Sequence, residues 1–186
     1  MSRSKHAPAR FHSYITAHDN HMAQLRATQF VGADTLSLVA WPGRLVMVGD
    51  IGCLGNITIS VEKYLKVITP DATPDHVLAG DHDVEVQTYI YSYRAGVRGH
   101  GTIVRVDNNH VWPGHPDEHH KHHCNWRSDD DSGEVEWLGE ERWPTLGEFV
   151  REVMEWHGTH REELPEPDQY AVPLERAPHI LWNPNT

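Results

Sequence analysis

Histidines gather in one short segment of this 186-residue chain. Six of the fourteen residues from His110 to His123 are histidines, and the segment closes with His119-His120-Lys121-His122-His123-Cys124. Imidazole titrates near neutral pH and is also the commonest metal ligand in proteins. The composition therefore predicts proton transfer, metal binding or anion binding as the chemistry of this segment.

An extended conformation of residues 119–124 would divide these side chains between two faces, because side chains alternate along a strand. One face would hold His119, Lys121 and His123. The other face would hold His120, His122 and Cys124. Each face is therefore a separate candidate site.

A metal site is one alternative for the cluster. Ligands spaced two residues apart on one strand do not easily surround a tetrahedral ion, so a metal would recruit a further side chain such as His110, His115 or Asp107. The candidate ligands for a divalent transition metal are His115, His120 and His122. Their spacing matches no standard zinc motif.

Metal-independent acid-base catalysis is the other alternative, and it requires no cofactor. Two imidazoles can exchange protons with a 2′-hydroxyl and a leaving 5′-oxygen while a cation neutralises the phosphorane charge. RNA carries that nucleophile in every nucleotide. Lys121 and Arg105 are nearby cations in the sequence, and Tyr91 and Tyr93 are on an adjacent predicted strand.

The strands that position the cluster are predicted by alternating residues. Val84 to Tyr93 places Tyr89, Tyr91 and Tyr93 on one face, and Thr102 to Asp107 forms a second strand after a glycine-rich connection. The two form an antiparallel hairpin that ends at Asn108, so the histidine segment follows the mouth of this hairpin. Strands are also expected at 36–41, 45–48, 57–62, with a continuation to 68 left open, and 134–138.

One helix has clear boundaries. Thr145 and Glu148 fit a capping box, and apolar residues recur on one face as far as His157. The predicted fold class is α+β: a curved antiparallel sheet of about five or six strands, with this C-terminal amphipathic helix packed on one face. The expected organisation is an N-terminal arm or helix at 1–35, a single catalytic-type domain at 36–160 and a proline-rich extended tail at 161–186.

Composition narrows the functional classes. Residues 128–168 hold fourteen carboxylates and three arginines, which equals the whole net charge of -11. This acidic segment is interpreted as solvated surface, with adaptation to a salty cytoplasm and an acidic docking face for a partner as alternatives. No strongly basic surface is predicted. Two cysteines and the absence of a long apolar run predict a cytoplasmic protein that does not contact membranes.

Three motifs occur in an order that resembles the TumE-like toxin family of prokaryotic toxin-antitoxin modules. They are Tyr91-Ser92-Tyr93, Arg105-Val106-Asp107-Asn108 and His119-His120-Lys121-His122, and a helix follows at Trp143-Pro144-Thr145-Leu146. The resemblance covers about residues 50–157. Val106 departs from the pattern, which has an aromatic residue there, and both chain ends lie outside it.

The resemblance implies a growth-inhibiting toxin that cleaves RNA, with a helix-turn-helix antitoxin as its partner; a homodimer is left open. As hypotheses, His119, His120 and His122 are the acid-base candidates, and Lys121 and Arg105 stabilise the phosphate charge. Asp107 orients an imidazole, and the candidates for substrate binding are Tyr91, Tyr93 and Asn108. A metal-dependent hydrolase and a non-catalytic regulatory binding protein remain as alternatives.

Overall fold

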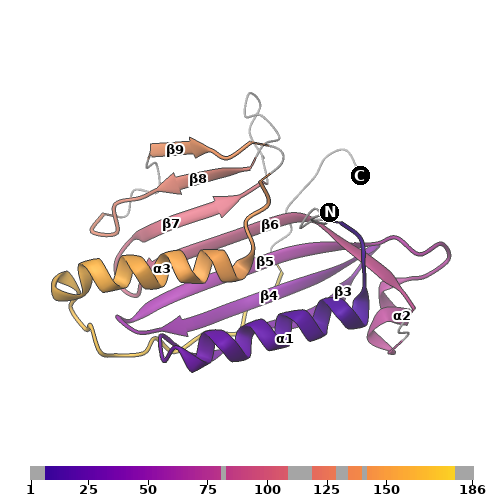
Figure 1. Cartoon of the computed structure of the whole chain (residues 1–186), viewed down its shortest axis with the longest axis horizontal. Helices are drawn as coiled ribbons and strands as arrows, with labels where there is room; N and C mark the ends of the chain where they lie inside the picture. Colours follow the sequence, from indigo (N-terminus) through magenta and orange to yellow (C-terminus); the bar gives the residue numbers. More distant parts are fainter. Residues whose placement is uncertain (1–6, 81–82, 109–118, 129–133, 140–141, 179–186) are drawn as a thin grey trace.

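The computed structural model describes residues 7–80, 83–108, 119–128, 134–139 and 142–178. Within these residues the chain is α+β, as predicted, with an open antiparallel sheet of nine strands rather than five or six (Figure 1). The strands are β1 (Ala9–Arg10), β2 (Val31–Asp34), β3 (Ser37–Trp41), β4 (Arg44–Cys53), β5 (Ile57–Val67), β6 (Glu85–Val97), β7 (Thr102–Asp107), β8 (His120–His123) and β9 (Glu134–Trp137).

The sheet is a meander in which sequence neighbours pair. Its order is β2-β4-β5-β6-β7-β8-β9, with β3 beside β4 and β1 beside β6. The turn between β3 and β4 is Pro42-Gly43, and Gly43 has a φ of 75°, a value that glycine adopts without strain. The strands missed in the sequence are β1 and β2, which are so short that few residues alternate.

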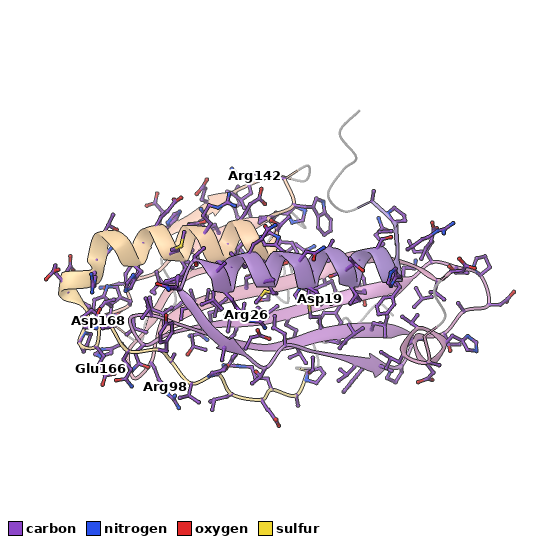
Figure 2. All side chains as sticks on the ribbon, turned by 60° about the horizontal axis from the view of Figure 1, so that its bottom comes forward. Asp19, Arg26, Arg98, Arg142, Glu166 and Asp168 are labelled. Carbon is purple, nitrogen blue, oxygen red and sulfur yellow. The ribbon has the colours of Figure 1, made fainter. Side chains whose placement is uncertain are left out.

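Helices α1 (Phe11–Ala27) and α3 (Leu146–His160) lie side by side on one face of the sheet (Figures 1 and 2). We call this the helix face and the opposite one the open face. Short helices α2 (Pro74–Leu78) and η1 (Arg161–Glu163) lie outside this layer. Among the described residues, no helix is long and apolar enough to cross a membrane.

The predicted capping box starts α3. Thr145 Oγ1 accepts a hydrogen bond from the Glu148 backbone N–H at 3.2 Å, and the Glu148 carboxylate accepts one from the Thr145 N–H at 2.8 Å. Leu146, Phe149 and Val153 are buried against the sheet. The helix continues to His160, three residues beyond His157, where the apolar pattern ends.

The segments predicted as an N-terminal arm or helix and as an extended C-terminal tail both pack on the sheet, and the N-terminal one forms helix α1. In the N-terminal segment, Met22 and Leu25 of α1 are buried in the same core as Phe149. The C-terminal segment is extended and crosses the open face of β4, where the Ala171 N–H donates to the Cys53 carbonyl at 3.0 Å. An added Cβ at Gly52 would lie 2.0 Å from the Ala171 carbonyl oxygen, so this crossing requires glycine.

Candidate functional site

Two rows of polar side chains cross the open face of the sheet. Directly paired residues of an antiparallel ladder project from the same face, and neighbouring strands are about 4.8 Å apart. The strand register therefore aligns one row as Glu62, Ser92, Asp107 and His120. The next row is Ser60, Arg94, Arg105 and His122.

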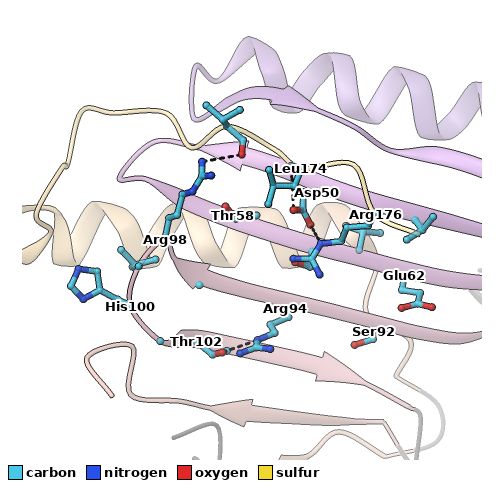
Figure 3. A pocket seen from close by; sticks show the side chains of 18 residues that line it. Asp50, Thr58, Glu62, Ser92, Arg94, Arg98, His100, Thr102, Leu174 and Arg176 are labelled. Carbon is cyan, nitrogen blue, oxygen red and sulfur yellow. Dashed lines mark hydrogen bonds and ion pairs between the residues drawn. The ribbon is translucent and has the colours of Figure 1, made fainter. Parts of the chain in front are cut away.

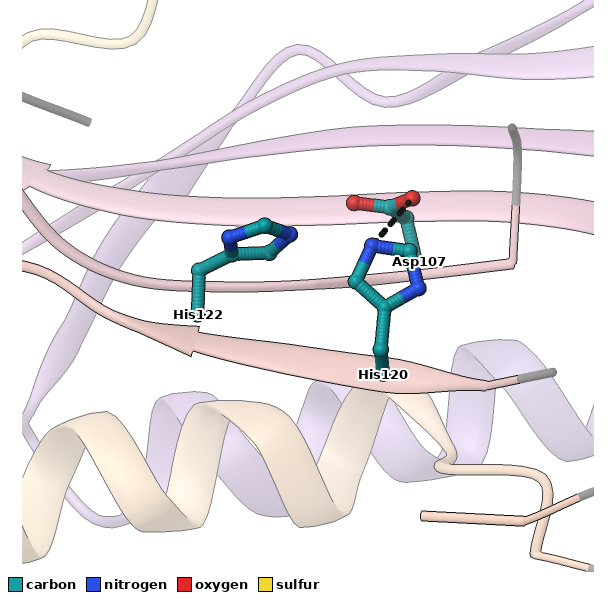
Figure 4. Close-up of side chains that lie close together, drawn as sticks. All are labelled: Asp107, His120 and His122. Carbon is teal, nitrogen blue, oxygen red and sulfur yellow. Dashed lines mark ion pairs between the residues drawn. The ribbon is translucent and has the colours of Figure 1, made fainter. Parts of the chain in front are cut away.

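Asp107, His120 and His122 converge where these rows meet β8 (Figure 4). Asp107 Oδ1 lies 3.3 Å from His120 Nε2, and the two imidazole rings are 4.7 Å apart between centroids in a T-shaped arrangement. All three side chains are buried, with exposed fractions of 5%, 2% and 7%. A carboxylate at this position stabilises a proton on His120 Nε2 and fixes the orientation of the ring.

Arg105 completes the cluster and contacts two of its members. Its Nη2 donates to His122 Nε2 at 2.8 Å, and its Nε lies 2.9 Å from Asp107 Oδ2. The second contact lacks hydrogen-bond geometry and is therefore an ion pair only. Because a guanidinium can only donate, His122 Nε2 must be the acceptor, which places the proton of the neutral ring on Nδ1.

His119 and Lys121 project toward the helix face. The Tyr91 hydroxyl and His119 Nδ1 are hydrogen bonded at 2.8 Å, and the Trp143 ring lies 4.3 Å from the His119 ring. Lys121 Nζ pairs with Glu152 of α3 at 3.0 Å. The alternation expected for β8 is therefore present, and it separates these two side chains from His120 and His122.

Tyr91 and Tyr93 lie in the core beneath α3, where Tyr93 packs on Phe149 with 5.6 Å between ring centroids. Burial raises the pKa of both phenols, and the Asp107 carboxylate raises that of Tyr91 further. Both tyrosines thus pack beneath the site, and Tyr91 also holds His119. Their place in the hydrophobic core favours a structural role over direct contact with substrate.

Asn108 connects the ends of β6 and β7. Its side-chain oxygen accepts from the Tyr91 N–H at 2.9 Å, and its amide donates to the Tyr89 carbonyl at 3.0 Å. Both bonds are to the backbone, so Asn108 fixes the end of the hairpin that carries Asp107. This is the turn chemistry typical of asparagine at a strand end.

The remaining members of the histidine segment contribute less to the cluster. His123 is half exposed and pairs with Glu136 at 3.1 Å, and Cys124 is part buried. His110 and His115 lie outside the described residues. The prediction that His115 binds a metal therefore stays a prediction. The other two predicted ligands, His120 and His122, lie close together.

A groove of about 440 Å³ lies on the open face beside this cluster (Figure 3). Ser92 and Arg94 line it, and they are the register partners of Asp107 and Arg105. Arg94 Nε donates to Thr102 Oγ1 at 2.8 Å, and the C-terminal segment borders the groove at Leu174 and Arg176. The cluster is thus continuous with an open, polar surface.

Sequence reasoning missed Ser92, Arg94 and Glu62 as neighbours of the site. The sequence pattern could have located Ser92 and Arg94, because they alternate with the tyrosines of β6 and therefore lie on the opposite face of the sheet. Glu62 could not be found in this way, since its position depends on the register between β5 and β6. Its carboxylate accepts from the Tyr64 hydroxyl at 2.5 Å.

The geometry also tests whether the residues fit a metal. One ligand atom from each of Asp107, His120 and His122 lies within 4.8 Å of the others, and two histidines with one carboxylate form a common transition-metal set. The guanidinium of Arg105 already contacts two of these three side chains. A metal would therefore have to displace a positive charge, which disfavours its binding in this arrangement.

The chain was also compared with known proteins. No protein-family model, curated protein or solved structure matches it.

Proposed function

We propose that this chain cleaves RNA by metal-independent acid-base catalysis at Asp107, His120, His122 and Arg105. The observation that carries the proposal is the pairing of two adjacent imidazoles with different partners. His120 is held by a carboxylate and His122 by a guanidinium. Such a pair can divide the roles of general base and general acid.

The neighbours of the two imidazoles, Asp107 and Arg105, indicate which ring is the general base and which is the general acid. In this mechanism Asp107 keeps the His120 proton at Nε2, and His120 Nδ1 accepts the proton of the 2′-hydroxyl. The 2′-oxygen then forms a bond to phosphorus while the bond from phosphorus to the 5′-oxygen breaks. When Arg105 turns to the phosphate and leaves His122 Nε2, that nitrogen takes up a proton from solvent, and the resulting imidazolium donates its Nδ1 proton to the leaving oxygen and returns to the neutral ring. The products are a 2′,3′-cyclic phosphate and a free 5′-hydroxyl.

Arg105 is the phosphate-binding group in this mechanism. Its side chain is 32% exposed, whereas the side chain of His120 is 2% exposed. A phosphate would therefore meet Arg105 first and compete for its guanidinium, since arginine binds phosphate through paired hydrogen bonds. Release of His122 and Asp107 by Arg105 would then admit the substrate to both imidazoles.

The biological role that we propose is that of a cytoplasmic toxin in a toxin-antitoxin module, with a helix-turn-helix antitoxin as its partner. The motif order of the TumE-like family supports this role. In a growth assay, induced expression should arrest cells, co-expression of the neighbouring gene should restore growth, and the His120→Gln variant should be harmless. Growth arrest by His120→Gln equal to that of the unchanged chain would contradict a catalytic toxin.

Cleavage is tested with the purified chain, a chelator and a labelled RNA oligonucleotide. We expect cleavage that stops when the nucleotide preceding the cut carries 2′-deoxyribose. His120→Gln and His122→Gln should each reduce the rate by at least about a hundredfold. His123→Gln is the matched control, because His123 is on the same strand but half exposed and outside the cluster. Unchanged cleavage in both cluster variants would overturn the assignment.

A metal-dependent hydrolase is the second candidate, and the convergence of Asp107, His120 and His122 favours it. These residues would hold the ion, which would supply an activated water as the nucleophile. Dialysis against chelator followed by elemental analysis separates the two candidates. About one tightly held transition metal per chain, with hydrolysis that requires it, would replace the metal-independent mechanism.

A further inference from the structure

A second pocket, of about 290 Å³, lies on the helix face, away from the histidine cluster. It is bounded by α1, by the start of α3 and by Lys63 of β5. Its volume is near the lower limit of about 300 Å³ for ligand pockets, so it would accept only a small molecule. Nothing in the proposed cleavage of RNA uses this pocket.

The wall of the pocket is mainly apolar. Met22, Leu25 and Leu146 contribute hydrophobic side chains, and Ala17 leaves open space on the exposed side of α1. His21 packs against Gly147, where an added Cβ would lie 1.8 Å from the imidazole Nε2. Glycine at this position therefore lets α1 approach the first turn of α3 and shape the pocket.

Lys63 supplies a positive charge inside this apolar wall. Its Nζ donates to the Tyr14 hydroxyl at 2.5 Å, and it forms no ion pair with a carboxylate among the described residues. Burial of Lys63 opposes its charged form, whereas the neighbouring Tyr93 and Tyr14 favour it. Together these effects raise the pKa of Lys63. The amine is thus a cation whose only described polar partner is a neutral hydroxyl.

The surroundings of Lys63 favour an anion over a cation or a neutral ligand. Burial and the Lys63 ammonium lower the pKa of His18, another lining residue. A carboxylate placed at Lys63 would offset the desolvation of the amine and form a charge-assisted hydrogen bond. The apolar wall would cover a short hydrocarbon body.

We propose that the Lys63 pocket binds a small amphipathic carboxylate, with its head group at Lys63 and its apolar body between α1 and the first turn of α3. This site is independent of the proposed cleavage site. Its ligand class follows from one part-buried cation beside a hydrophobic wall, at whose rim Ala17 is exposed.

The test uses sodium octanoate and 1-octanol as probes, titrated calorimetrically into the full chain. We expect one octanoate per chain and at least about tenfold weaker binding of 1-octanol, which has the same body but no charge. Lys63→Met should weaken octanoate about tenfold or more and leave 1-octanol unchanged. Lys66→Met is the matched control, because Lys66 is exposed on the same strand.

A steric variant keeps the test decisive if Lys63→Met does not fold. Ala17 is exposed on α1, so Ala17→Leu is compatible with the helix and should fill the pocket, reducing the binding of octanoate. Equal affinity for octanoate and 1-octanol would overturn the proposal. So would octanoate binding that neither Lys63→Met nor Ala17→Leu changes.

Discussion

Arg105 Nη2 donates a hydrogen bond to His122 Nε2 across β7 and β8, at a distance of 2.8 Å. The contact occupies one nitrogen of His122 with a donor and therefore determines which nitrogen carries the proton of the neutral ring. It also holds a partly exposed cation beside two buried imidazoles. The consequences of this relationship, and of the division of β8 between two faces, can be measured.

Arg105→Gln should remove the phosphate-binding charge while keeping a side chain that can donate to His122. We expect the rate of RNA cleavage to fall by about a hundredfold or more, comparable with the loss of an oxyanion donor in other enzymes. Arg105→Lys should recover part of this loss, because lysine keeps the charge but not the planar fork. The control is Arg127→Gln, because Arg127 is an exposed arginine that pairs with Glu163 away from the cluster. Full activity in Arg105→Gln would exclude Arg105 from the mechanism.

Lys121→Met should leave RNA cleavage within about twofold, because Lys121 lies on the helix face and pairs with Glu152. Loss of this ion pair should lower the free energy of unfolding by about 0.5–1 kcal/mol. A double-mutant cycle with Glu152→Gln, followed by urea denaturation, measures the pair itself. Loss of cleavage in a folded Lys121→Met protein would restore Lys121 as the phosphate-stabilising group.

Alkaline pH should destabilise the fold through Tyr91 and Tyr93. Burial raises the pKa of both phenols, so above about pH 10 the unfolded chain releases protons that the folded chain retains. The free energy of unfolding must then fall as pH rises. Tyr93→Phe should reduce this slope between pH 9 and about 11, measured by urea denaturation. An equal slope in Tyr93→Phe and in the unchanged chain would contradict this role of Tyr93.

The two cysteines should differ in their reaction with iodoacetamide. Cys53 is 0% exposed, and burial raises the pKa of its thiol, which suppresses the reactive thiolate. Cys124 is part exposed and should be alkylated at least about tenfold faster at neutral pH. Mass spectrometry of tryptic peptides measures both rates, and urea should equalise them. Equal rates in the folded protein would contradict the burial of Cys53.

Local patterns predicted the elements that carry the site. Alternation in β6 and β7 indicated the hairpin, and the capping box at Thr145 marked the start of α3. These signals are short-range, because a strand alternates every two residues and a helix cap needs only four. The packing of the first 35 residues was missed, since α1 lacks the strong amphipathic pattern of α3 and is held by its contacts with β2 and α3.

By itself, the sequence determined which residue types can do chemistry and that neighbours along β8 take opposite faces. Only the tertiary structure decided that His120 and His122 share a face with Asp107 and Arg105, while Lys121 takes the other. The reason is physical: the register between β7 and β8 is set between two strands that residues 108–119 separate, and not within either strand. It is constrained by the hydrophobic face that must be buried under α3, and no local pattern specifies that pairing.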